Sequence, residues 1–440
     1  MIVGDAVELI NAYYVEPTDT KDLLTAAMDG LTGSLDQHSS FIPGDAYDSF
    51  QDSINQEFAG IGIFVEQPEK GKPVRVITPL VGSPALEKGV LPNDQIVRVD
   101  AVDVTTMDLK AVSDRLKGPI GTTVNIQVRR AVDSNENEPQ TTDADSAAET
   151  KLVSMTIPRK TIALESVIGD HRSEDNKWVY RLESDPDIAY IRLTSFGEKT
   201  VRELQQVLTN LNNEFEALVL DLRGNSGGLL YAARDVSDMF IDKGRIVSTK
   251  TRGGVLEEVY DAQPGTLVAP NKLLTVLIDG GSASASEIVA ACLQDSKRAV
   301  VVGTRSYGKG TVQNILPLQY GRSALRLTVA RYYRPSDKNI HRSKDDTEED
   351  EWGVKPDEGF QVTVDDETLI KLGQRWREAS YPLLSAPKTS DPDATETPTS
   401  LTVDPQLKRA VDHLRENLDG KSSPEVDSNL EPQEPEKVAA

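Results

Sequence analysis

The sequence has one cysteine among its 440 residues, so an internal disulfide is excluded. Cys292 falls on the apolar side of a predicted helix, which is typical of a small core residue. No apolar run approaches the roughly 18 residues of a membrane span, and the segment Met1 to Asp5 lacks the basic and apolar regions of a signal peptide. We therefore expect the chain as given to be soluble.

Basic residues are also scarce. Lys and Arg number 48 against 71 Asp and Glu, which gives a formal net charge of −23 at pH 7. This acidity disfavours a nucleic acid or an anionic membrane surface as a partner. The four histidines lie outside any motif typical of catalysis, so a general base is expected among other residue types; they are His38, His171, His341 and His413.

The segment from Leu273 to Lys309 has the strongest local pattern. An apolar run over Leu273 to Ile278 stops at a glycine turn, and small residues then lead into a helical repeat. This order predicts a strand, a tight turn and a helix. Ser284 lies at the predicted helix start, where free N–H groups and the positive end of the helix dipole favour developing negative charge.

A serine hydroxyl is a weak nucleophile until a base removes its proton. After a second apolar strand, Ala299 to Val302, Lys309 stands between Gly308 and Gly310. A lysine held at a strand end in an apolar site loses its proton more easily, because desolvation disfavours the ammonium. Ser284 and Lys309 would therefore form a workable dyad.

Both residues also have plainer explanations. Ser284 to Glu287 fits a helix capping box, which is compatible with catalysis. Residues 303–309 fit most of a phosphate-binding loop, but such a loop requires Ser or Thr next, where this chain has Gly310. Strands rather than a helix are expected to follow, over Val312 to Leu318 and Ala324 to Ala330. Nucleotide binding is therefore disfavoured, and neither a cofactor nor a metal is expected.

Three ordered blocks stand out: DLRGNSGG, GSASASEI around Ser284, and GKGTVQ around Lys309. Together they resemble the signatures of the C-terminal processing (tail-specific) peptidases, which are PDZ-containing serine proteases. The resemblance implies that Ser284 is the nucleophile, Lys309 the general base, and Gln313 the residue that orients the lysine. Ser226 stands where the family usually has proline, so the loop is expected to be less stiff but to keep its N–H donors.

The block DLRGNSGG follows Ala217 to Leu222, an apolar run typical of a buried parallel strand. Glycines let backbone N–H groups face a ligand without interference from side chains, as an oxyanion hole requires. The resemblance implies that Gly227 and Gly228 donate to the tetrahedral intermediate, together with the N–H of Ala285. From the motif alone, a plain strand-to-helix turn explains the glycines equally well.

Short strands separated by glycines run from Phe58 to Arg130 and resemble a PDZ domain. The glycine loop of such a domain offers N–H groups to a peptide C-terminal carboxylate, while the peptide adds a strand to the sheet edge. In this interpretation the carboxylate binds at Gly60, Ile61, Gly62 and Ile63. The alternative is that the loop only leads into a hairpin.

The alternation of helices with apolar strands after residue 151 predicts an α/β core with crossover connections. The resemblance implies a multidomain α/β chain: a crotonase-like protease core, an inserted PDZ domain and a helical N-terminal region, where His38 is expected to be structural. The C-terminal helix is expected to be capped by Asp404 and to stop at Gly420. The expected boundaries are 1–57 for the helical region, 58–132 for the PDZ domain, 133–150 for an acidic disordered linker, 151–384 for the protease domain with an acidic insertion at 343–352, 385–403 for a mobile linker, 404–419 for a C-terminal helix and 420–440 for a disordered tail.

The predicted function is a serine endopeptidase that recognises protein C-terminal tails through its PDZ domain and cleaves them through an acyl-enzyme. Expected partners are protein or peptide substrates with free tails, and an adaptor or a second copy of the chain; no membrane span and no nucleic acid are expected. The alternatives are a non-catalytic PDZ peptide-binding protein on a protease-like scaffold and a ligand-binding relative of the same fold. The resemblance implies the periplasm or cell envelope, whereas the missing signal in this sequence would fit the cytoplasm.

Overall fold

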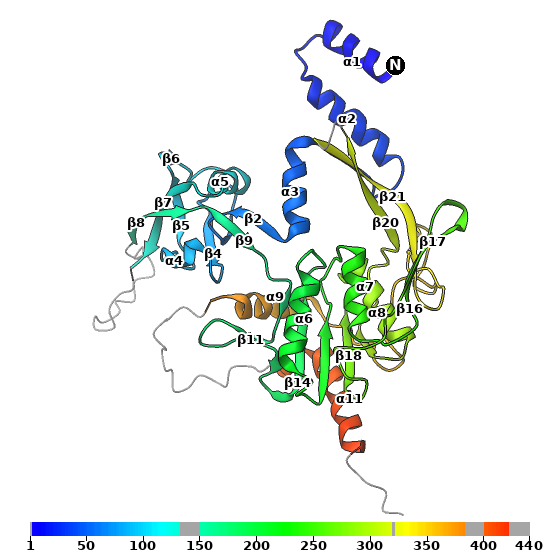
Figure 1. Cartoon of the computed structure of the whole chain (residues 1–440). Helices are drawn as coiled ribbons and strands as arrows, with labels where there is room; N and C mark the ends of the chain where they lie inside the picture. The colour runs from blue at the N-terminus through cyan, green and yellow to red at the C-terminus, as the bar shows by residue number, and fades with distance from the viewer. Residues whose placement is uncertain (1, 133–149, 319–321, 383–399, 422–440) are drawn as a thin grey trace, which may run out of the picture.

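The computed structural model describes residues 2–132, 150–318, 322–382 and 400–421. A large body contains two sheets, a smaller body contains a third sheet, and a helical arm projects from the large body at the N-terminus (Figure 1). Within these ranges no helix combines the length and apolarity that a membrane crossing requires. The predicted acidic linker and disordered tail lie almost wholly outside the described residues.

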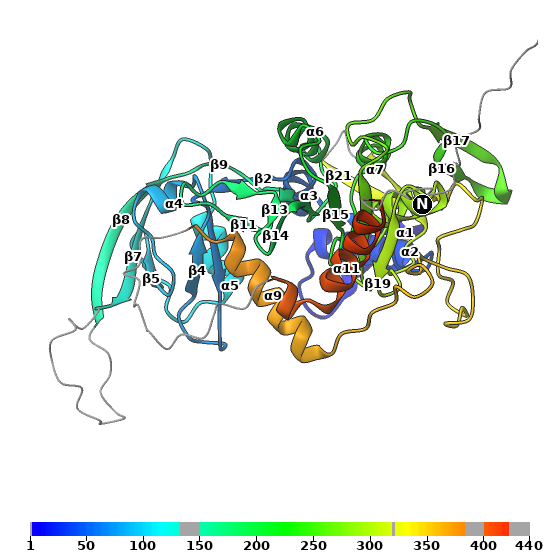
Figure 2. The ribbon, with the colours of Figure 1, turned by 90° about the horizontal axis from the view of Figure 1, so that it is seen from below.

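The central sheet of the large body has the strand order β10-β14-β15-β18-β19, and β14 to β19 in this order run parallel. Three crossover helices cover one face and a C-terminal helix covers the other (Figure 2). The predicted alternation of helices and apolar strands is confirmed. The elements are β10 (Val167–Ile168), β13 (Arg181–Leu182, paired with β14), β14 (Asp185–Leu193), α6 (Thr200–Leu211), β15 (Ala217–Asp221), α7 (Leu230–Asp238), β18 (Leu273–Ile278), α8 (Ala285–Asp295), β19 (Val300–Gly303) and α11 (Pro405–Lys421).

Each face of this sheet buries alternate side chains of the same strands. Leu218 and Leu220 of β15 pack with α6, α7 and α8, whereas Val219 packs with Leu407 and Leu414 of α11. The C-terminal helix is therefore part of the core. Its predicted stop at Gly420 is wrong, since α11 continues to Lys421; a glycine in a helix costs only about 1 kcal/mol, so it does not end the helix by itself.

The second sheet has the order β1-β21-β16-β17, and β20 also pairs with β21. The two predicted strands after Lys309 are confirmed as the β20–β21 hairpin. β1 comes from the N-terminal region and pairs with β21, with Phe41 opposite Leu325, so this region is joined to the large body by a strand. The bounds are β1 (Ser40–Ile42), β16 (Arg245–Lys250), β17 (Leu256–Asp261), β20 (Thr311–Leu318) and β21 (Ser323–Tyr333).

The third sheet forms the smaller body around a separate apolar core. Its last strand, β8, pairs with β7 from Thr123 opposite Pro158 to Ala131 opposite Thr150. The boundary predicted at residue 151 is therefore wrong, because β8 completes this sheet instead of opening the protease domain. The elements are β3 (Ile63–Glu66), β4 (Arg75–Pro79), α4 (Pro84–Glu87), β5 (Gln95–Val99), β6 (Val102–Asp103), α5 (Leu109–Leu116), β7 (Thr123–Ala131) and β8 (Thr150–Pro158).

The chain enters and leaves the smaller body through two paired strands. β2 (Glu57–Gly60) is antiparallel to β9 (Lys160–Ala163), with Phe58 opposite Ile162. The smaller body is thus inserted between the N-terminal region and the central sheet through a two-stranded ladder.

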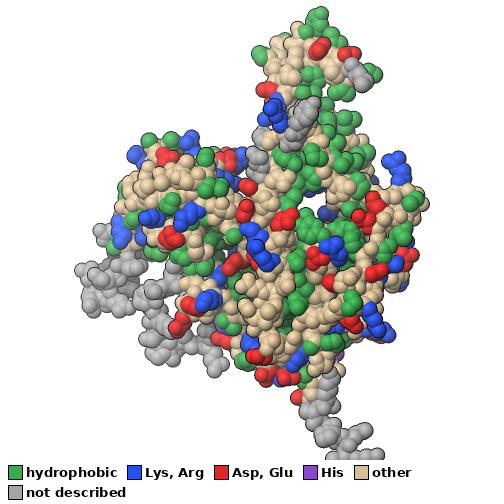
Figure 3. Space-filling model, in the orientation of Figure 1, with side chains coloured by type: hydrophobic (Ala, Val, Ile, Leu, Met, Phe, Trp, Pro, Cys, Tyr) green, Lys and Arg blue, Asp and Glu red, His purple; other side chains and the backbone are tan. Residues whose placement is uncertain are grey.

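The N-terminal arm consists of α1 (Ile2–Tyr13), α2 (Thr20–Gly33) and, next to the large body, α3 (Gly44–Asn55). Its outer helices and the segment between them expose large apolar side chains: Ile2, Leu9, Tyr13, Val15 and Leu31 are all more than half exposed. Figure 3 shows hydrophobic side chains on this arm at the top of the view. Isolated exposed apolar residues are normal, but a group of them is typical of an interaction surface.

The remaining elements lie at the edges of the large body. They are β11 (His171–Arg172), β12 (Trp178–Val179), the 3-10 helix η1 (Arg252–Gly254), α9 (Asp366–Ser380) and α10 (Ser400–Val403). The predicted insertion at 343–352 is a loop, in which Trp352 lies between the guanidinium groups of Arg305 and Arg342.

Candidate active site

Ser284 lies at the junction of β18 and α8, as predicted. It is the N-cap residue of α8, and its side chain is buried. Its backbone has φ 55° and ψ −112°, a sparsely populated combination for a residue other than glycine. Such strain persists only where the surrounding structure enforces it, and it is concentrated at functional sites.

Hydrogen bonds join the Ser284 turn, between β18 and the first turn of α8, to the loop after β15 (residues 222–229, the glycine loop). The Ser282 hydroxyl donates to the Leu222 carbonyl at 2.8 Å. The Ala283 N–H and the Ser286 hydroxyl both donate to the Asn225 carbonyl, at 3.0 and 2.8 Å. The two loops therefore form one unit at the carboxyl ends of the parallel strands, where open α/β sheets place their ligands.

The buried carboxylate of Glu287 joins the Ser284 turn to the Lys309 loop. Its Oε2 accepts from the backbone N–H groups of Ser284 at 2.8 Å and Lys309 at 2.9 Å. Its Oε1 accepts from the Gly308 N–H at 2.7 Å and the Ser306 hydroxyl at 2.6 Å. Burial raises the pKa of Glu287 to about 7, although these hydrogen bonds favour the ionised form. The sequence motif predicts only a capping role for Glu287, whereas its carboxylate holds the backbone of both dyad candidates.

Lys309 lies in the loop between β19 and β20 with a half-buried side chain. Burial lowers the pKa of its ammonium, the nearby Arg326 lowers it further, and Glu287 opposes the shift. We find no hydrogen bond or ion pair of Nζ among the described residues. The Ser284 hydroxyl is thus not hydrogen-bonded to this amine, although the lowered pKa of Lys309 favours the neutral form that a general base requires.

Ser284 and Lys309 line the same cavity, of about 260 Å³. This volume lies below the roughly 300–1,000 Å³ of sites for drug-sized ligands, and it suits a side chain or a short peptide segment. No group of residues in the described ranges could hold a metal ion. The other lining residues are Gly228, Leu229, Leu230, Thr249, Glu257, Glu258, Val312, Gln313, Asn314, Val329 and Tyr332.

The glycine loop contacts Ser284 directly. A Cβ atom on Gly227 would lie 2.8 Å from Ser284 Cβ and 3.0 Å from the Ala285 nitrogen, so glycine is required there. The Gly227 N–H already donates to Asn225 Oδ1 at 2.9 Å. The Gly228 N–H, which belongs to a residue lining the cavity, has no acceptor among the described residues. The structure thus brings all three predicted oxyanion residues together, and of the two glycines only Gly228 has an N–H without an acceptor among the described residues.

The sequence matches peptidase family S41 over residues 187–359 and a PDZ domain over residues 75–130. It is 37% identical over 342 residues to the carboxy-terminal-processing protease of Bartonella bacilliformis, covering 77% of this chain and 71% of that protein. The chain belongs to peptidase family S41. This confirms the predicted family and the predicted class of enzyme, a serine peptidase of the C-terminal processing kind with a PDZ domain.

Two further relatives of this S41 peptidase are similar along most of the chain. The carboxy-terminal processing protease CtpA of Bacillus subtilis is 32% identical over 357 residues, covering 80% of this chain and 67% of that protein. Among solved structures, a photosystem II D1 C-terminal processing protease aligns with 87% of this chain and 98% of that chain, at 26% identity and a TM-score of 0.43.

Gln313 lines the S41 cavity but does not contact the Lys309 amine in this structure. Its amide donates to the hydroxyls of Thr311 at 2.8 Å and Thr328 at 3.2 Å. The Thr328 hydroxyl in turn donates to Asp36, at 3.2 Å. The predicted orienting role of Gln313 therefore stays a prediction, since no hydrogen bond joins it to Lys309 among the described residues.

His38 lies near the peptidase site but outside its cavity. Burial lowers the pKa of its imidazole, and so do the nearby positive charges of Lys309 and Arg326. With His341 it lines a separate cavity of about 1110 Å³ beside the Lys309 loop, which includes neither Ser284 nor Lys309. This cavity is thus distinct from the one that the dyad candidates line.

Tyr332 is a residue of the S41 site that the sequence did not reveal. It is buried on β21 and lines the cavity of Ser284. Burial raises the pKa of its phenol to about 12, and a hydrogen bond with the Ser284 side chain opposes that shift. No sequence motif indicated this place for Tyr332, because β21 is far from Ser284 in the sequence.

The four residues predicted to bind a carboxylate lie at the entry of the PDZ sheet. Gly60 belongs to β2 and pairs with Lys160, and Ile63 opens β3. The N–H groups of Ile61 and Gly62 have no acceptor in the described part of the chain, while their carbonyls accept from Ala85 and Leu80, both at 3.0 Å. Two N–H groups are therefore available at this loop.

Proposed function

We propose that Ser284 is the nucleophile and Lys309 the general base of this peptidase. The observation that carries the proposal is the shared cavity: a strained serine at a helix start and a half-buried lysine with a lowered pKa line the same small space. Glu287 supports it, because this carboxylate holds both backbones at hydrogen-bond distance.

In the proposed reaction, neutral Lys309 takes the proton of Ser284 while Oγ attacks the peptide carbonyl carbon. The carbonyl oxygen becomes an oxyanion and accepts hydrogen bonds from the N–H groups of Gly228 and Ala285. The C–N bond breaks, Lys309 returns the proton to the leaving amine, and an ester with Ser284 remains. Lys309 then takes a proton from a water molecule, whose oxygen attacks the ester carbon. The bond between this carbon and Oγ breaks, Lys309 returns the proton to Oγ, and the carboxylic acid product leaves and ionises.

The role of Gln313 in this proposal is to orient Lys309 once its amide leaves Thr328. The role of Gly227 is steric, since only glycine fits against Ser284 and Ala283. Its N–H holds the Asn225 side chain and thereby shapes the loop.

We infer that the substrates are proteins with free C-terminal tails. The PDZ match over residues 75–130 and the two free N–H groups of Ile61 and Gly62 support this, since PDZ domains bind terminal carboxylates at such a loop while the peptide adds a strand. Gly60 and Ile63 flank these donors and complete the predicted binding loop.

We also propose the finer organisation of the chain. The parallel sheet with its crossover helices is consistent with a crotonase-like protease core, and the helices α1 to α3 with a helical N-terminal region. The predicted boundaries are changed at two places: the PDZ domain is extended to include β8, and the C-terminal helical region takes in α10 and continues to Lys421. The family resemblance favours a periplasmic or cell-envelope location.

The exposed apolar side chains of α1 and α2 support association with a second copy of the chain or with an adaptor. Light scattering of the purified protein distinguishes the two. A dimer or larger assembly supports self-association, whereas a monomer leaves the surface to an adaptor.

The proposed chemistry is tested with wild type, Ser284→Ala and Lys309→Ala on an unfolded protein with an apolar C-terminal tail, followed by mass spectrometry. Cleavage by wild type alone is expected. Cleavage by both variants at the wild-type rate would refute the dyad. A fluorophosphonate probe should label wild type at Ser284, and a failure to label would favour a PDZ peptide-binding protein without catalysis.

A further inference from the structure

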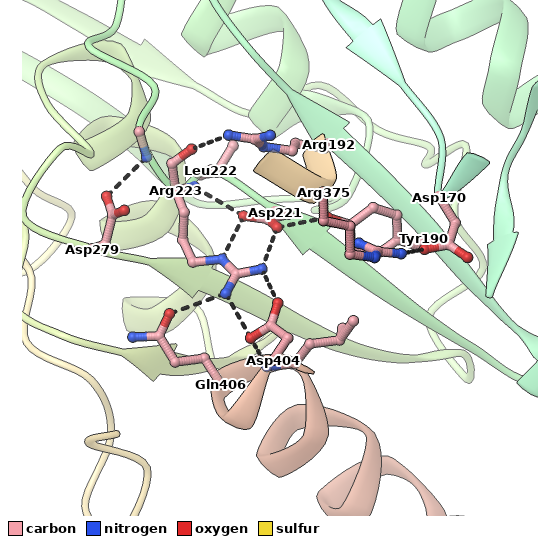
Figure 4. Close-up of polar contacts among 12 residues, drawn as sticks. Asp170, Tyr190, Arg192, Asp221, Leu222, Arg223, Asp279, Arg375, Asp404 and Gln406 are labelled. Carbon is pink, nitrogen blue, oxygen red and sulfur yellow. Dashed lines mark hydrogen bonds and ion pairs between the residues drawn. The ribbon is translucent and has the colours of Figure 1, made fainter. Parts of the chain in front are cut away.

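Arg223 is the first residue after Leu222 in the glycine loop, and its side chain is 1% exposed. Its guanidinium lies between the end of β15 and the start of the C-terminal helix (Figure 4). A guanidinium has five N–H groups, and here each has an acceptor. The acceptors are Asp221 at 3.0 and 2.6 Å, Asp404 at 2.9 and 2.7 Å, and Gln406 at 3.0 Å.

Asp404 connects this guanidinium to α11. It is fully buried, and its Oδ1 also accepts from the Leu407 N–H at 3.0 Å as the helix cap. Gln406 is held in turn by a bond from its amide to the Val362 carbonyl at 2.8 Å. The first turn of α11 packs on the central sheet through Leu407. The start of α11 is therefore a fixed support for the Arg223 side chain.

The backbone of Arg223 is fixed as well. Its N–H donates to Asp221 at 2.9 Å, and its carbonyl accepts from Arg192 at 3.1 Å. The next N–H, of Gly224, donates to Asp279 at 2.8 Å. Four residues beyond Arg223, Gly227 contacts Ser284. The position of the Arg223 guanidinium therefore helps to set the position of the glycine loop, and with it the position of the Gly228 N–H.

We propose that Asp404 is a positioning residue of the S41 active site, which acts through Arg223 on the glycine loop. The inference rests on the proposed function, in which Gly228 donates to the oxyanion. Loss of the Asp404 charge leaves the buried guanidinium short of a counter-charge, and the loop then relaxes around it. The C-terminal helix is in this sense part of the catalytic apparatus, although no residue of it touches the substrate.

The test compares Asp404→Asn with Leu414→Ala in the full chain. Leu414 lies on the apolar face of the same helix and has no contact with Arg223, so its variant weakens the docking of α11 by loss of packing alone. Loss of an oxyanion donor lowers kcat by about 10²–10³. A donor that is displaced but still present should lower kcat less than a donor that is lost. We therefore expect kcat of Asp404→Asn to fall about 10- to 100-fold at unchanged KM.

Two readouts separate positioning from folding. Thermal unfolding gives the stability lost by each variant, and the labelling rate of a fluorophosphonate probe reports on the oxyanion donors without a peptide substrate. We expect Asp404→Asn to slow labelling, and Leu414→Ala to lose stability but keep its kcat and its labelling rate.

The proposal is overturned if Asp404→Asn keeps the wild-type kcat, or if Leu414→Ala loses as much kcat at equal loss of stability. If Asp404→Asn does not fold, Gln406→Ala replaces it, because Gln406 is a neutral acceptor of the same guanidinium; a severalfold lower kcat is then expected, and an unchanged kcat refutes the proposal. Failure of the dyad is recognised separately, since Ser284→Ala would then cleave like wild type.

Discussion

Only the neutral form of Lys309 can accept the proton of Ser284. Because burial and Arg326 lower the pKa of Lys309, the neutral fraction at a given pH is larger than for free lysine, whose pKa is about 10.4. We therefore expect kcat/KM to rise with pH and to level off below that value. A pH–rate profile on a peptide substrate measures this.

The control for the Lys309 profile is Lys309→Arg, which stays protonated and should be nearly inactive at every pH. A wild-type rate that falls continuously above neutral pH, with no preceding rise, would contradict a neutral lysine base.

The Glu287 carboxylate gives a second prediction. In Glu287→Gln, one of the two oxygens becomes an amide nitrogen that faces two N–H or O–H donors instead of accepting from them. Each buried donor left unpaired costs about 1–3 kcal/mol. We expect a lower melting temperature and at least a tenfold loss of kcat/KM, measured by thermal unfolding and peptide cleavage.

Ser306→Ala is the control for Glu287→Gln, because it removes one donor to the carboxylate and leaves the carboxylate in place. It also leaves the Val354 N–H without its acceptor, so it should lose stability but lose less kcat/KM than Glu287→Gln. The pH dependence of stability should also differ between wild type and Glu287→Gln. The folded-state pKa of Glu287, about 7, lies above its usual 4.5, so the stability from this group is present below about pH 4.5 and is lost as the pH rises through about 7. Glu287→Gln should lack this pH-dependent part of the stability. A variant whose stability changes with pH as in wild type would refute the assignment to Glu287.

Local sequence motifs were sufficient to select Ser284 and Lys309 as dyad candidates, and the structure places both on one cavity. They were not sufficient for Glu287 or Tyr332. A Glu three residues into a helix has an ordinary explanation as a cap, and its bonds to the Lys309 loop depend on how β18 and β19 pair. For Gln313 the motif predicted a contact with Lys309 that the structure does not show. Its amide donates instead to the Thr328 hydroxyl.

Among the elements, the loop between β2 and β3 gives a prediction for substrate selection. Gly62 has φ 77°, and a Cβ there would lie 2.4 Å from Ser83 Cβ. Gly62→Ala should therefore displace the loop and weaken the binding of free C-terminal tails, while the protease site stays intact. Cleavage rates of one tail with a free and with an amidated C-terminus measure the effect.

Wild type should prefer the free carboxylate, and Gly62→Ala should lose most of that preference, leaving a slow cleavage of both tails. Fluorophosphonate labelling of Ser284 should be unchanged and serves as the control. A variant that keeps the full preference would show that the carboxylate binds elsewhere.

The element boundaries show where the sequence gives no local signal. β8 has a clear strand pattern, yet its partner β7 lies beyond an intervening acidic stretch, so its sheet could not be assigned from periodicity. Asp404 was correctly predicted as a helix cap. Its bond to Arg223 spans 181 positions, and no local pattern contains it.

The molecule as a whole carries a net charge of −23 at pH 7. Tails with several acidic residues should therefore associate more slowly than basic ones at low salt. We expect kcat/KM for a Lys-rich tail to exceed that for a Glu-rich tail severalfold at about 0.01 M salt, where the Debye length is about 30 Å, and the difference to shrink at 0.15 M, where it is about 8 Å.

Both tails should share the same last residues, so that the PDZ contacts are equal. A difference that persists unchanged at high salt would indicate specific contacts at the site instead of the overall field of the protein.

The two-stranded ladder of β2 and β9 also matters for engineering. Neighbouring strands lie about 4.8 Å apart, so the smaller body is attached at two nearly coincident points. A domain whose ends are so close can be exchanged without stretching or crossing the chain of its host. The PDZ domain of this protease should therefore be exchangeable. A foreign PDZ domain joined after Gly60 and before Lys160 would redirect cleavage to new substrates and leave the catalytic residues unaltered.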